Sequence, residues 1–310
     1  MRSRTRLLLL VSAVALPFLA GCGASVPDAP APTSSPSQES APPQVIVVDE
    51  ELAPIEEEFH ARVGVSVLDT GTGATIDYRS EERFGFASTL KVFAVAEMLR
   101  QVAPEQRDEL VTWTEETVAD AGYSPITAEH VADGLTLAQL AEAALRDSDN
   151  AATNLILDRI GGVEGMQAGL KRLGDSTTDV SDVEPELNEV VPGDTGNTTT
   201  PAAFTADLSA LLRPEHLEPA DRATLLEWMS GNATGDALIR AGAPADWAVA
   251  DKSGGAGAMR NDIAVVTAPG RDPIIVTILT EKNDPDAAYE DEIVARVAEV
   301  VLAASNGDRS

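Results

Sequence analysis

Residues 88–99 read Ser-Thr-Leu-Lys-Val-Phe-Ala-Val-Ala-Glu-Met-Leu, with a serine and a lysine three positions apart at the start of an apolar run. The apolar run predicts a buried helix. On a helix, Ser88 and Lys91 would lie one turn apart on the same face. Burial disfavours an ammonium ion and lowers the lysine pKa, and a neutral amine can activate a serine. Ser88 is therefore a candidate nucleophile and Lys91 a candidate base.

Composition indicates an acidic globular protein. The chain has 310 residues, of which 44% are hydrophobic, enough for one large or two ordinary domains with a proper core. The formal net charge of -29 argues against nucleic acid or an anionic membrane surface as an electrostatic partner, because both would be repelled. It is typical of a solvated acidic surface, and it would also suit a saline or alkaline exterior.

The N-terminus predicts export. Arg2, Arg4 and Arg6 precede an apolar segment, residues 7–19, that is too short for a stable membrane span. The sequence Leu19-Ala20-Gly21-Cys22 then resembles a bacterial lipobox, in which the cysteine becomes the lipidated first residue. Because Cys22 is the only cysteine, no internal disulfide can form. The alternative is an ordinary signal peptide cleaved nearby.

We therefore expect three parts: a lipoprotein signal peptide over residues 1–21, a Pro/Ser-rich tether over 22–44 and a catalytic domain over 45–310. The tether has hardly any large apolar residue, so it cannot offset its ordering entropy. As a coil it would span on the order of 25 Å. The mature protein is expected to be anchored to the outer face of the bacterial cell membrane.

Hydrophobic periodicity in the domain changes twice along the chain. Strands are predicted near both ends and helices between them, with turns at glycines such as 71, 73, 161 and 174. The predicted strands are 63–67, 76–78, 247–251, 263–267 and 274–279, and the predicted helices are 49–59, 88–102, 136–145, 150–160, 163–173, 201–212, 221–229 and 287–304.

This order predicts an α/β (α+β) fold. One antiparallel sheet flanked by helices is built from the N- and C-terminal segments, residues 45–86 and 235–310, and an all-helical lobe, residues 87–234, is inserted between them. Small-molecule sites usually form in such clefts between lobes. Ser88 stands where the chain crosses from the sheet to the helices.

Two further motifs accompany Ser88 and Lys91. Ser148-Asp149-Asn150 falls at a break between two predicted helices, where such side chains also serve as caps. Lys252-Ser253-Gly254 follows a predicted strand, where the lysine could be an ordinary edge charge and the glycine allows close approach of a ligand. Each motif is weak by itself. S-x-x-K, S-D-N and K-T-G together characterise class A β-lactamases and penicillin-binding proteins, and all three appear here in that order, with Ser for Thr in the last.

From about Val45 to Ala304 the chain resembles a class A serine β-lactamase. Further segments that match are 84–91, Tyr123-Ser124-Pro125, Asn154, the Ω-loop-like Glu184-Pro185-Glu186-Leu187-Asn188, and Asn232-Ala233-Thr234-Gly235. The resemblance implies the β-lactamase/transpeptidase-like fold and hydrolysis of the β-lactam amide bond through a serine acyl-enzyme. Penicillins, with cephalosporins as a further class, are the implied substrates, and antibiotic resistance is the implied outcome.

The resemblance also implies catalytic roles. Ser88 would attack the lactam carbonyl with Lys91 beside it, and the N–H groups of Ser88 and Gly255 would form the oxyanion hole. Ser148 would relay a proton to the leaving nitrogen. Glu184 and Asn188 would hold the water that hydrolyses the acyl-enzyme. The base that acts in acylation is left open, because it is disputed within the family.

Substrate-binding residues are implied in the same way. Asn150 would orient both the amide side chain of the substrate and Lys91. A cationic, hydroxyl-bearing wall for the substrate carboxylate would comprise Lys252, Ser253 and Arg260. Thr234 and Tyr123 would also contact substrate, although Tyr123 could equally be packing at a turn.

Two departures from the family pattern bear on the site. Where relatives carry an arginine and an aspartate across the neck of the Ω-loop, this chain has Asp182 and Asn197, and we expect these two to touch without opposite charge. The segment 255–259 is one residue shorter than in common relatives, which leaves the lip of the site and the cephalosporin range open.

Two other functions remain as alternatives at this point. A penicillin-binding D,D-peptidase or transpeptidase uses the same serine and lysines, but it has no need of Glu184 and Asn188 for a deacylating water. A non-hydrolytic β-lactam-binding lipoprotein would fit the altered Ω-loop. No cofactor or metal is expected, because no Cys or His cluster has ligand spacing. The expected partner is a small β-lactam, and the expected state is a monomer.

Overall fold

The computed structural model describes residues 44–191 and 193–307. The predicted signal peptide over 1–21, Cys22 and all of the predicted tether except Gln44 lie outside the described residues. Within the described ranges, no helix is long and apolar enough to cross a membrane.

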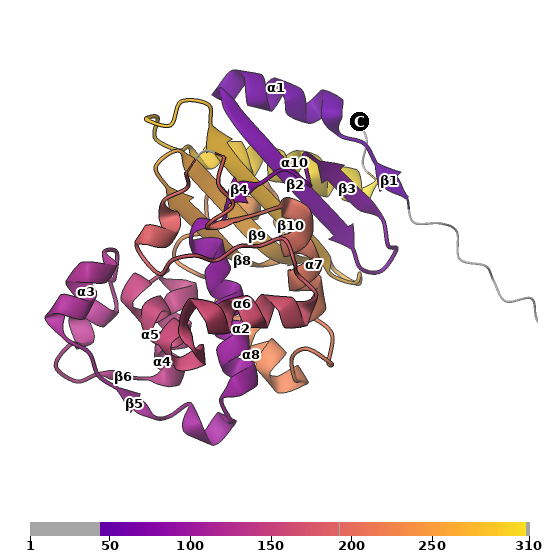
Figure 1. The fold of residues 1–310 in the computed structure, drawn as a ribbon. Coiled ribbons are helices and arrows are strands. Elements are labelled where there is room, and N and C mark those ends of the chain that lie inside the picture. The colour runs from indigo at the N-terminus through magenta and orange to yellow at the C-terminus, as the bar shows by residue number, and fades with distance from the viewer. Residues whose placement is uncertain (1–43, 192, 308–310) are drawn as a thin grey trace, which may run out of the picture. The chain divides into compact units, whose positions relative to one another are not determined.

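A six-stranded sheet lies at the centre of the fold, and its strands come from both ends of the described chain (Figure 1). Strand β2 (Ala61–Asp69) pairs antiparallel with β10 (Ile274–Lys282), so that Val67 faces Val276. The predicted antiparallel sheet is confirmed, whereas the parallel pairing of β1 with β3 was not predicted. In order across the sheet the strands are β1 (Val45–Ile46), β3 (Thr75–Tyr78), β2 (Ala61–Asp69), β10 (Ile274–Lys282), β9 (Met259–Thr267) and β8 (Ala248–Ala256).

Helices cover both faces of this sheet. Helices α1 (Asp49–Phe59) and α10 (Asp291–Asn306) contact each other and pack on β2 and β10 (Figure 1). Helix α7 (Pro201–Leu211) packs on β2 and β10 as well. Successive side chains of a strand point to opposite faces of the sheet. Ile274 and Val276 therefore pack in the core with α1 and α10, whereas Ile275 packs in the core on the other face, with α2 and α7.

The inserted segment surrounds α2 (Lys91–Gln101), in which every residue from Lys91 to Leu99 is buried. Two short antiparallel ladders, β4 with β7 and β5 with β6, make this segment mostly rather than all helical. Its other elements are η1 (Ala87–Leu90), η2 (Pro104–Gln106), β5 (Leu110–Val111), α3 (Glu115–Ala121), η3 (Thr127–His130), β6 (Leu135–Thr136), α4 (Leu137–Arg146), α5 (Asn150–Ile160), α6 (Gly162–Leu173), η4 (Glu186–Asn188), β7 (Thr198–Thr199) and α8 (Pro219–Met229); β4 (Phe84–Gly85), the partner of β7, precedes it and α9 (Ile239–Gly242) follows it.

Two boundaries near Ser88 differ from the prediction. Ser88 lies in the 3₁₀ turn η1, and α2 begins only at Lys91. Strand β8 does not end before Lys252 but continues to Ala256, because its ladder with β9 pairs Lys252 with Ile263. A Cβ on Gly254 would lie 3.0 Å from Phe86 O and 3.2 Å from Ser88 N, so β8 passes close to the backbone of η1 and a larger residue there would make a tight contact.

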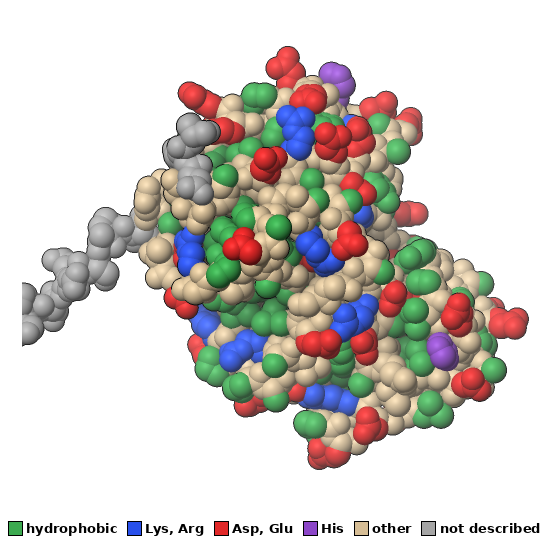
Figure 2. Space-filling view, turned by 180° about the vertical axis from the view of Figure 1, so that it is seen from behind, with side chains coloured by type: hydrophobic (Ala, Val, Ile, Leu, Met, Phe, Trp, Pro, Cys, Tyr) green, Lys and Arg blue, Asp and Glu red, His purple; other side chains and the backbone are tan. Residues whose placement is uncertain are grey.

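Acidic side chains are spread over the face drawn in Figure 2, as the net charge of -29 leads one to expect. One carboxyl group is instead inside the protein. Asp207, on α7, is 2% exposed, and its Oδ2 atom, like that of Asp175, has no hydrogen-bond partner among the described residues. Burial, with a smaller contribution from neighbouring Asp175, raises the pKa of Asp207 to about 9.

Asp207→Asn is expected to stabilise the protein at pH 8. Because the folded state keeps the Asp207 proton while the unfolded state releases it at a pKa of 3.8, stability is full below pH 3.8 and declines progressively until the pH passes the folded pKa of about 9. Asparagine removes that loss, so we expect about 1–3 kcal/mol of added unfolding free energy at pH 8. Urea unfolding from pH 4 to 9 measures it, with exposed Asp286→Asn as the control. Equal pH slopes in both variants would contradict the assignment.

Candidate active site

A cavity of about 550 Å³ opens between η1, the α4–α5 junction, the segment after α8, and β8. Most of the residues predicted from the motifs line it. The predicted residues in its wall are Ser88, Tyr123, Ser148, Asn150, Asn188, Thr234, Ser253, Gly255 and Arg260. The other three, Lys91, Glu184 and Lys252, are almost completely buried behind this wall.

Lys91 is held by three groups from two segments that lie far from it in the sequence, residues 148–150 and Glu184. Its Nζ atom donates to the carbonyl oxygen of Ser148 at 2.7 Å and to Oδ1 of Asn150 at 2.7 Å. It also forms an ion pair with Oε1 of Glu184 at 3.0 Å. Burial lowers the pKa of Lys91, and the charge of Glu184 opposes that change. The amine can therefore act as a proton acceptor more readily than a solvated lysine.

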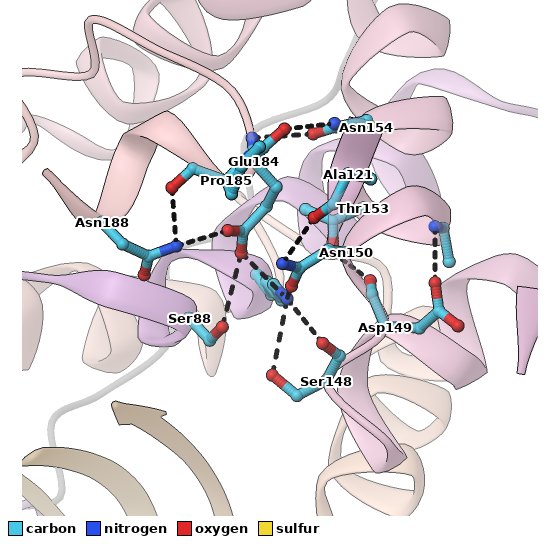
Figure 3. A network of polar contacts seen from close by, with 12 residues as sticks. Ser88, Ala121, Ser148, Asp149, Asn150, Thr153, Asn154, Glu184, Pro185 and Asn188 are labelled. Atoms are coloured by element: carbon cyan, nitrogen blue, oxygen red, sulfur yellow. Dashed lines mark hydrogen bonds and ion pairs between the residues drawn. The ribbon is translucent and has the colours of Figure 1, made fainter. Parts of the chain in front are cut away.

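Ser88 and the Ω-loop segment 184–188 meet at the Glu184 carboxylate (Figure 3). Ser88 Oγ donates to its Oε1 atom at 3.4 Å, and Asn188 Nδ2 donates to its Oε2 atom at 2.6 Å. Asn154 fixes the backbone of the same residue, because its side chain donates to the Glu184 carbonyl at 2.7 Å and accepts from the Glu184 N–H at 2.9 Å. Side chains from η1, α5 and η4 thus position one carboxylate.

Ser148 lies between the two buried lysines. Its hydroxyl accepts from Lys252 Nζ at 3.0 Å and from Lys91 Nζ at 3.4 Å. Its backbone has a φ of 57°, which few residues other than glycine adopt. Asp149 caps α5 by accepting from Ala152 N at 2.8 Å, so the expected capping is confirmed. This hydrogen bond of Asp149 holds the turn in which the Ser148 hydroxyl contacts Lys91 Nζ and Lys252 Nζ.

Lys252 is fully buried on β8. Burial, together with the positive charge of nearby Lys91, lowers its pKa to about 7. Beside it on β8, Ser253 Oγ donates to Thr234 Oγ1 at 2.7 Å. Of the wall that the resemblance implied, Ser253 and Arg260 line the cavity, whereas Lys252 is buried behind them.

Arg260 has partners that the motifs did not reveal. Its Nε atom donates to Oδ1 of Asp291 at 2.6 Å, and its guanidinium lies 4.9 Å from the ring centre of Tyr289. Both partners line the cavity, as does Asp236. Tyr289 falls inside the predicted helix 287–304, but α10 begins only at Asp291, which leaves Tyr289 in the loop before it. Tyr123 is 61% exposed at the cavity, so it stands at the entrance rather than in packing.

The predicted contact across the neck of the Ω-loop is confirmed. Asn197 Nδ2 donates to Oδ2 of Asp182 at 2.9 Å. Asn197 Oδ1 in turn accepts from the N–H groups of Ser181, at 3.0 Å, and Asp182, at 3.2 Å. The neck is therefore closed by an amide and a carboxylate instead of an ion pair.

Asn197→Asp is expected to loosen this neck. The variant keeps the two acceptor contacts but loses the donor to Asp182 and places two carboxylates face to face, at a cost of about 1–2 kcal/mol, since Asp182 is exposed. Displacement of Glu184 should slow deacylation more than acylation. Adding Asp182→Arg should restore both stability and deacylation. A double-mutant cycle on both quantities measures the coupling, and strictly additive effects would show that the two side chains do not cooperate.

A serine at a turn, two buried amines and an adjacent carboxylate are the parts of a serine-dependent acyl-transfer enzyme. Comparison with known proteins specifies the class. The model of the "Beta-lactamase enzyme family" matches residues 48–304. The chain is 42% identical to a β-lactamase of Bacillus licheniformis over 96% of this chain and 94% of that protein, and 45% identical to β-lactamase 1 of Bacillus cereus over 82% and 83%.

Solved structures agree with these relatives. A class A β-lactamase from Clostridium kluyveri DSM 555 superposes with a TM-score of 0.81 at 40% identity, covering 83% of this chain and 98% of that one. A halotolerant bacterial β-lactamase superposes with a TM-score of 0.78 at 40% identity, covering 81% and 97%. The chain belongs to the β-lactamase enzyme family, as a class A serine β-lactamase, and its activity is the hydrolysis of β-lactams.

Proposed function

We propose that Ser88 forms the acyl-enzyme and that Glu184 drives its hydrolysis. The observation that carries this division is the convergence of Ser88 Oγ, Lys91 Nζ and Asn188 Nδ2 on one buried carboxylate. With its lowered pKa, Lys91 can accept the Ser88 proton in acylation. Glu184, oriented by Asn188, then serves as general base toward the hydrolytic water.

Ser148 is the proton relay in this scheme, because its hydroxyl contacts both Lys91 and Lys252. As the lactam C–N bond breaks, the hydroxyl passes a proton to the leaving nitrogen and is resupplied from the amines. The N–H groups of Ser88 and Gly255 stabilise the oxyanion, for which η1 and β8 lie close together. Asn150 positions the amide side chain of the substrate.

The substrate carboxylate binds the wall of Lys252, Ser253, Thr234 and Arg260. Lys252 is half charged at its pKa of about 7 and mostly charged below it, and the substrate anion favours the charged form. Tyr123 borders the entrance. Penicillins are the proposed first substrate class, with cephalosporins as a second, and their hydrolysis would confer resistance. All these groups come from one chain, which supports action as a monomer.

Purified protein lacking residues 1–44 tests this assignment against its alternatives. We expect steady turnover of a chromogenic cephalosporin and of a labelled penicillin. A stable stoichiometric adduct would instead favour a penicillin-binding peptidase or a silent binding protein, because both acylate without rapid deacylation.

We further propose that the enzyme is exported and lipid-anchored through Cys22 to the outer face of the bacterial cell membrane. The support is the sequence around Leu19-Ala20-Gly21-Cys22 and the arginines before it. Cys22→Ala should move the protein from the membrane fraction to the soluble or secreted fraction, because a lipid anchor needs the thiol. Fractionation and immunoblotting measure this, and unchanged membrane association would refute lipidation.

A further inference from the structure

A second cavity, of about 540 Å³, lies where the ends of β2, β9 and β10 approach α7 and α8. It shares no lining residue with the catalytic cleft. Its wall is largely apolar, with Leu68 from β2, Val265 from β9 and Leu226 from α8. A volume of this size is typical of sites for small ligands.

Two basic side chains distinguish this cavity from a simple packing defect. Most Lys and Arg side chains in the described ranges form ion pairs with carboxylates. Arg213 and Arg222 form none there, although the protein is strongly acidic, and both line this cavity. Arg222 donates one hydrogen bond, from Nη1 to the carbonyl oxygen of Leu212, and its other N–H groups stay available to a ligand.

The acidic residue in the wall does not cancel these charges. Asp69 Oδ1 accepts from the N–H groups of Gly71 and Thr72, at 2.9 and 3.0 Å. Its Oδ2 atom pairs with Arg271 at 2.7 Å. The Asp69 carboxylate is thus satisfied by other groups, and the two remaining guanidinium groups give the cavity a net positive charge beside its apolar wall.

We propose that this cavity is a second ligand site, which binds an amphipathic carboxylate with a medium-length alkyl chain. Leu68, Val265 and Leu226 enclose the chain, and burial of its surface drives association. The carboxylate meets Arg213 and Arg222, because the planar guanidinium fork matches two carboxylate oxygens. The ligand would bridge the sheet to α7 and α8.

Sodium decanoate is a suitable probe, and decanol is its uncharged counterpart. Calorimetric titration should use the whole chain carrying Cys22→Ala, so that no attached lipid competes. We expect saturable decanoate binding and at least about tenfold weaker binding of decanol, as one charge-assisted contact is lost. Decanoate binding should leave β-lactam turnover free of competitive inhibition, which separates this site from the carboxylate wall of the catalytic cleft.

Arg213→Gln is the decisive variant, because Arg213 is exposed and its side chain holds no hydrogen bond among the described residues. It should weaken decanoate about tenfold and leave decanol unchanged. Arg159→Gln, at an exposed arginine of α5 that also lacks an ion pair in the described structure, should change neither. Ser209→Phe, which fills the cavity, should abolish binding of both. Equal affinity for decanoate and decanol, an unaffected Arg213→Gln variant, or binding that only competes with substrate would overturn the proposal.

Discussion

Glu184→Ala should convert the enzyme into one that is acylated and then stalls. The carboxylate is the proposed base for deacylation, and general-base assistance contributes about 10²–10⁴-fold, so deacylation should fall by that factor. Acylation should stay measurable. Loss of the Glu184 charge removes an interaction that raises the Lys91 pKa, which favours a neutral amine beside Ser88. Mass spectrometry after brief mixing with a penicillin should show the addition of one opened drug molecule.

Glu186→Ala provides the matched control, because Glu186 is an exposed glutamate two residues further along the same loop. It should turn over at the parental rate. A Glu184→Ala enzyme in which acylation and deacylation fall by the same factor would refute the proposed division of labour.

Ser88→Ala should abolish covalent labelling by any β-lactam and lower turnover by about 10⁴-fold or more, as removal of a catalytic serine nucleophile does. The fold should persist, since the Ser88 side chain makes only one long hydrogen bond in the described structure, to Glu184 at 3.4 Å. A fluorescent penicillin and a melting curve test the two statements. Ser181→Ala, at an exposed serine, is the control, and labelling that survives in Ser88→Ala would eliminate Ser88 as the nucleophile.

Several elements could be predicted because their signals are local. Helix α1 has the predicted bounds, and so does α5, which begins after the Asp149 cap and ends at Gly161 with its positive φ. Two-residue strands such as β4 and β7 could not be predicted, because they exist only through pairing between segments far apart in the chain. Helix α3 was also missed, since few of its residues are buried and its hydrophobic period is weak.

The candidate site, too, has features that the sequence predicts and features that only the tertiary structure reveals. The chemical types of Ser88, Lys91, Ser148 and Lys252, and their order, are visible in short motifs, as is the exchange that leaves Asp182 and Asn197 at the Ω-loop neck. Those motifs led to the family, and the family implied which groups should meet.

What the sequence by itself determined was therefore the residue types, the order of strands and helices, and the class of chemistry. Only the tertiary structure decided the protonation environment and the walls of the cleft. The lowered pKa of Lys252 needs burial and the charge of Lys91. The pairing of Arg260 with Tyr289 and Asp291 needs β9 to lie beside the start of the closing helix. Desolvation and Coulomb interactions depend on distance in space, and a sequence states only distance along the chain.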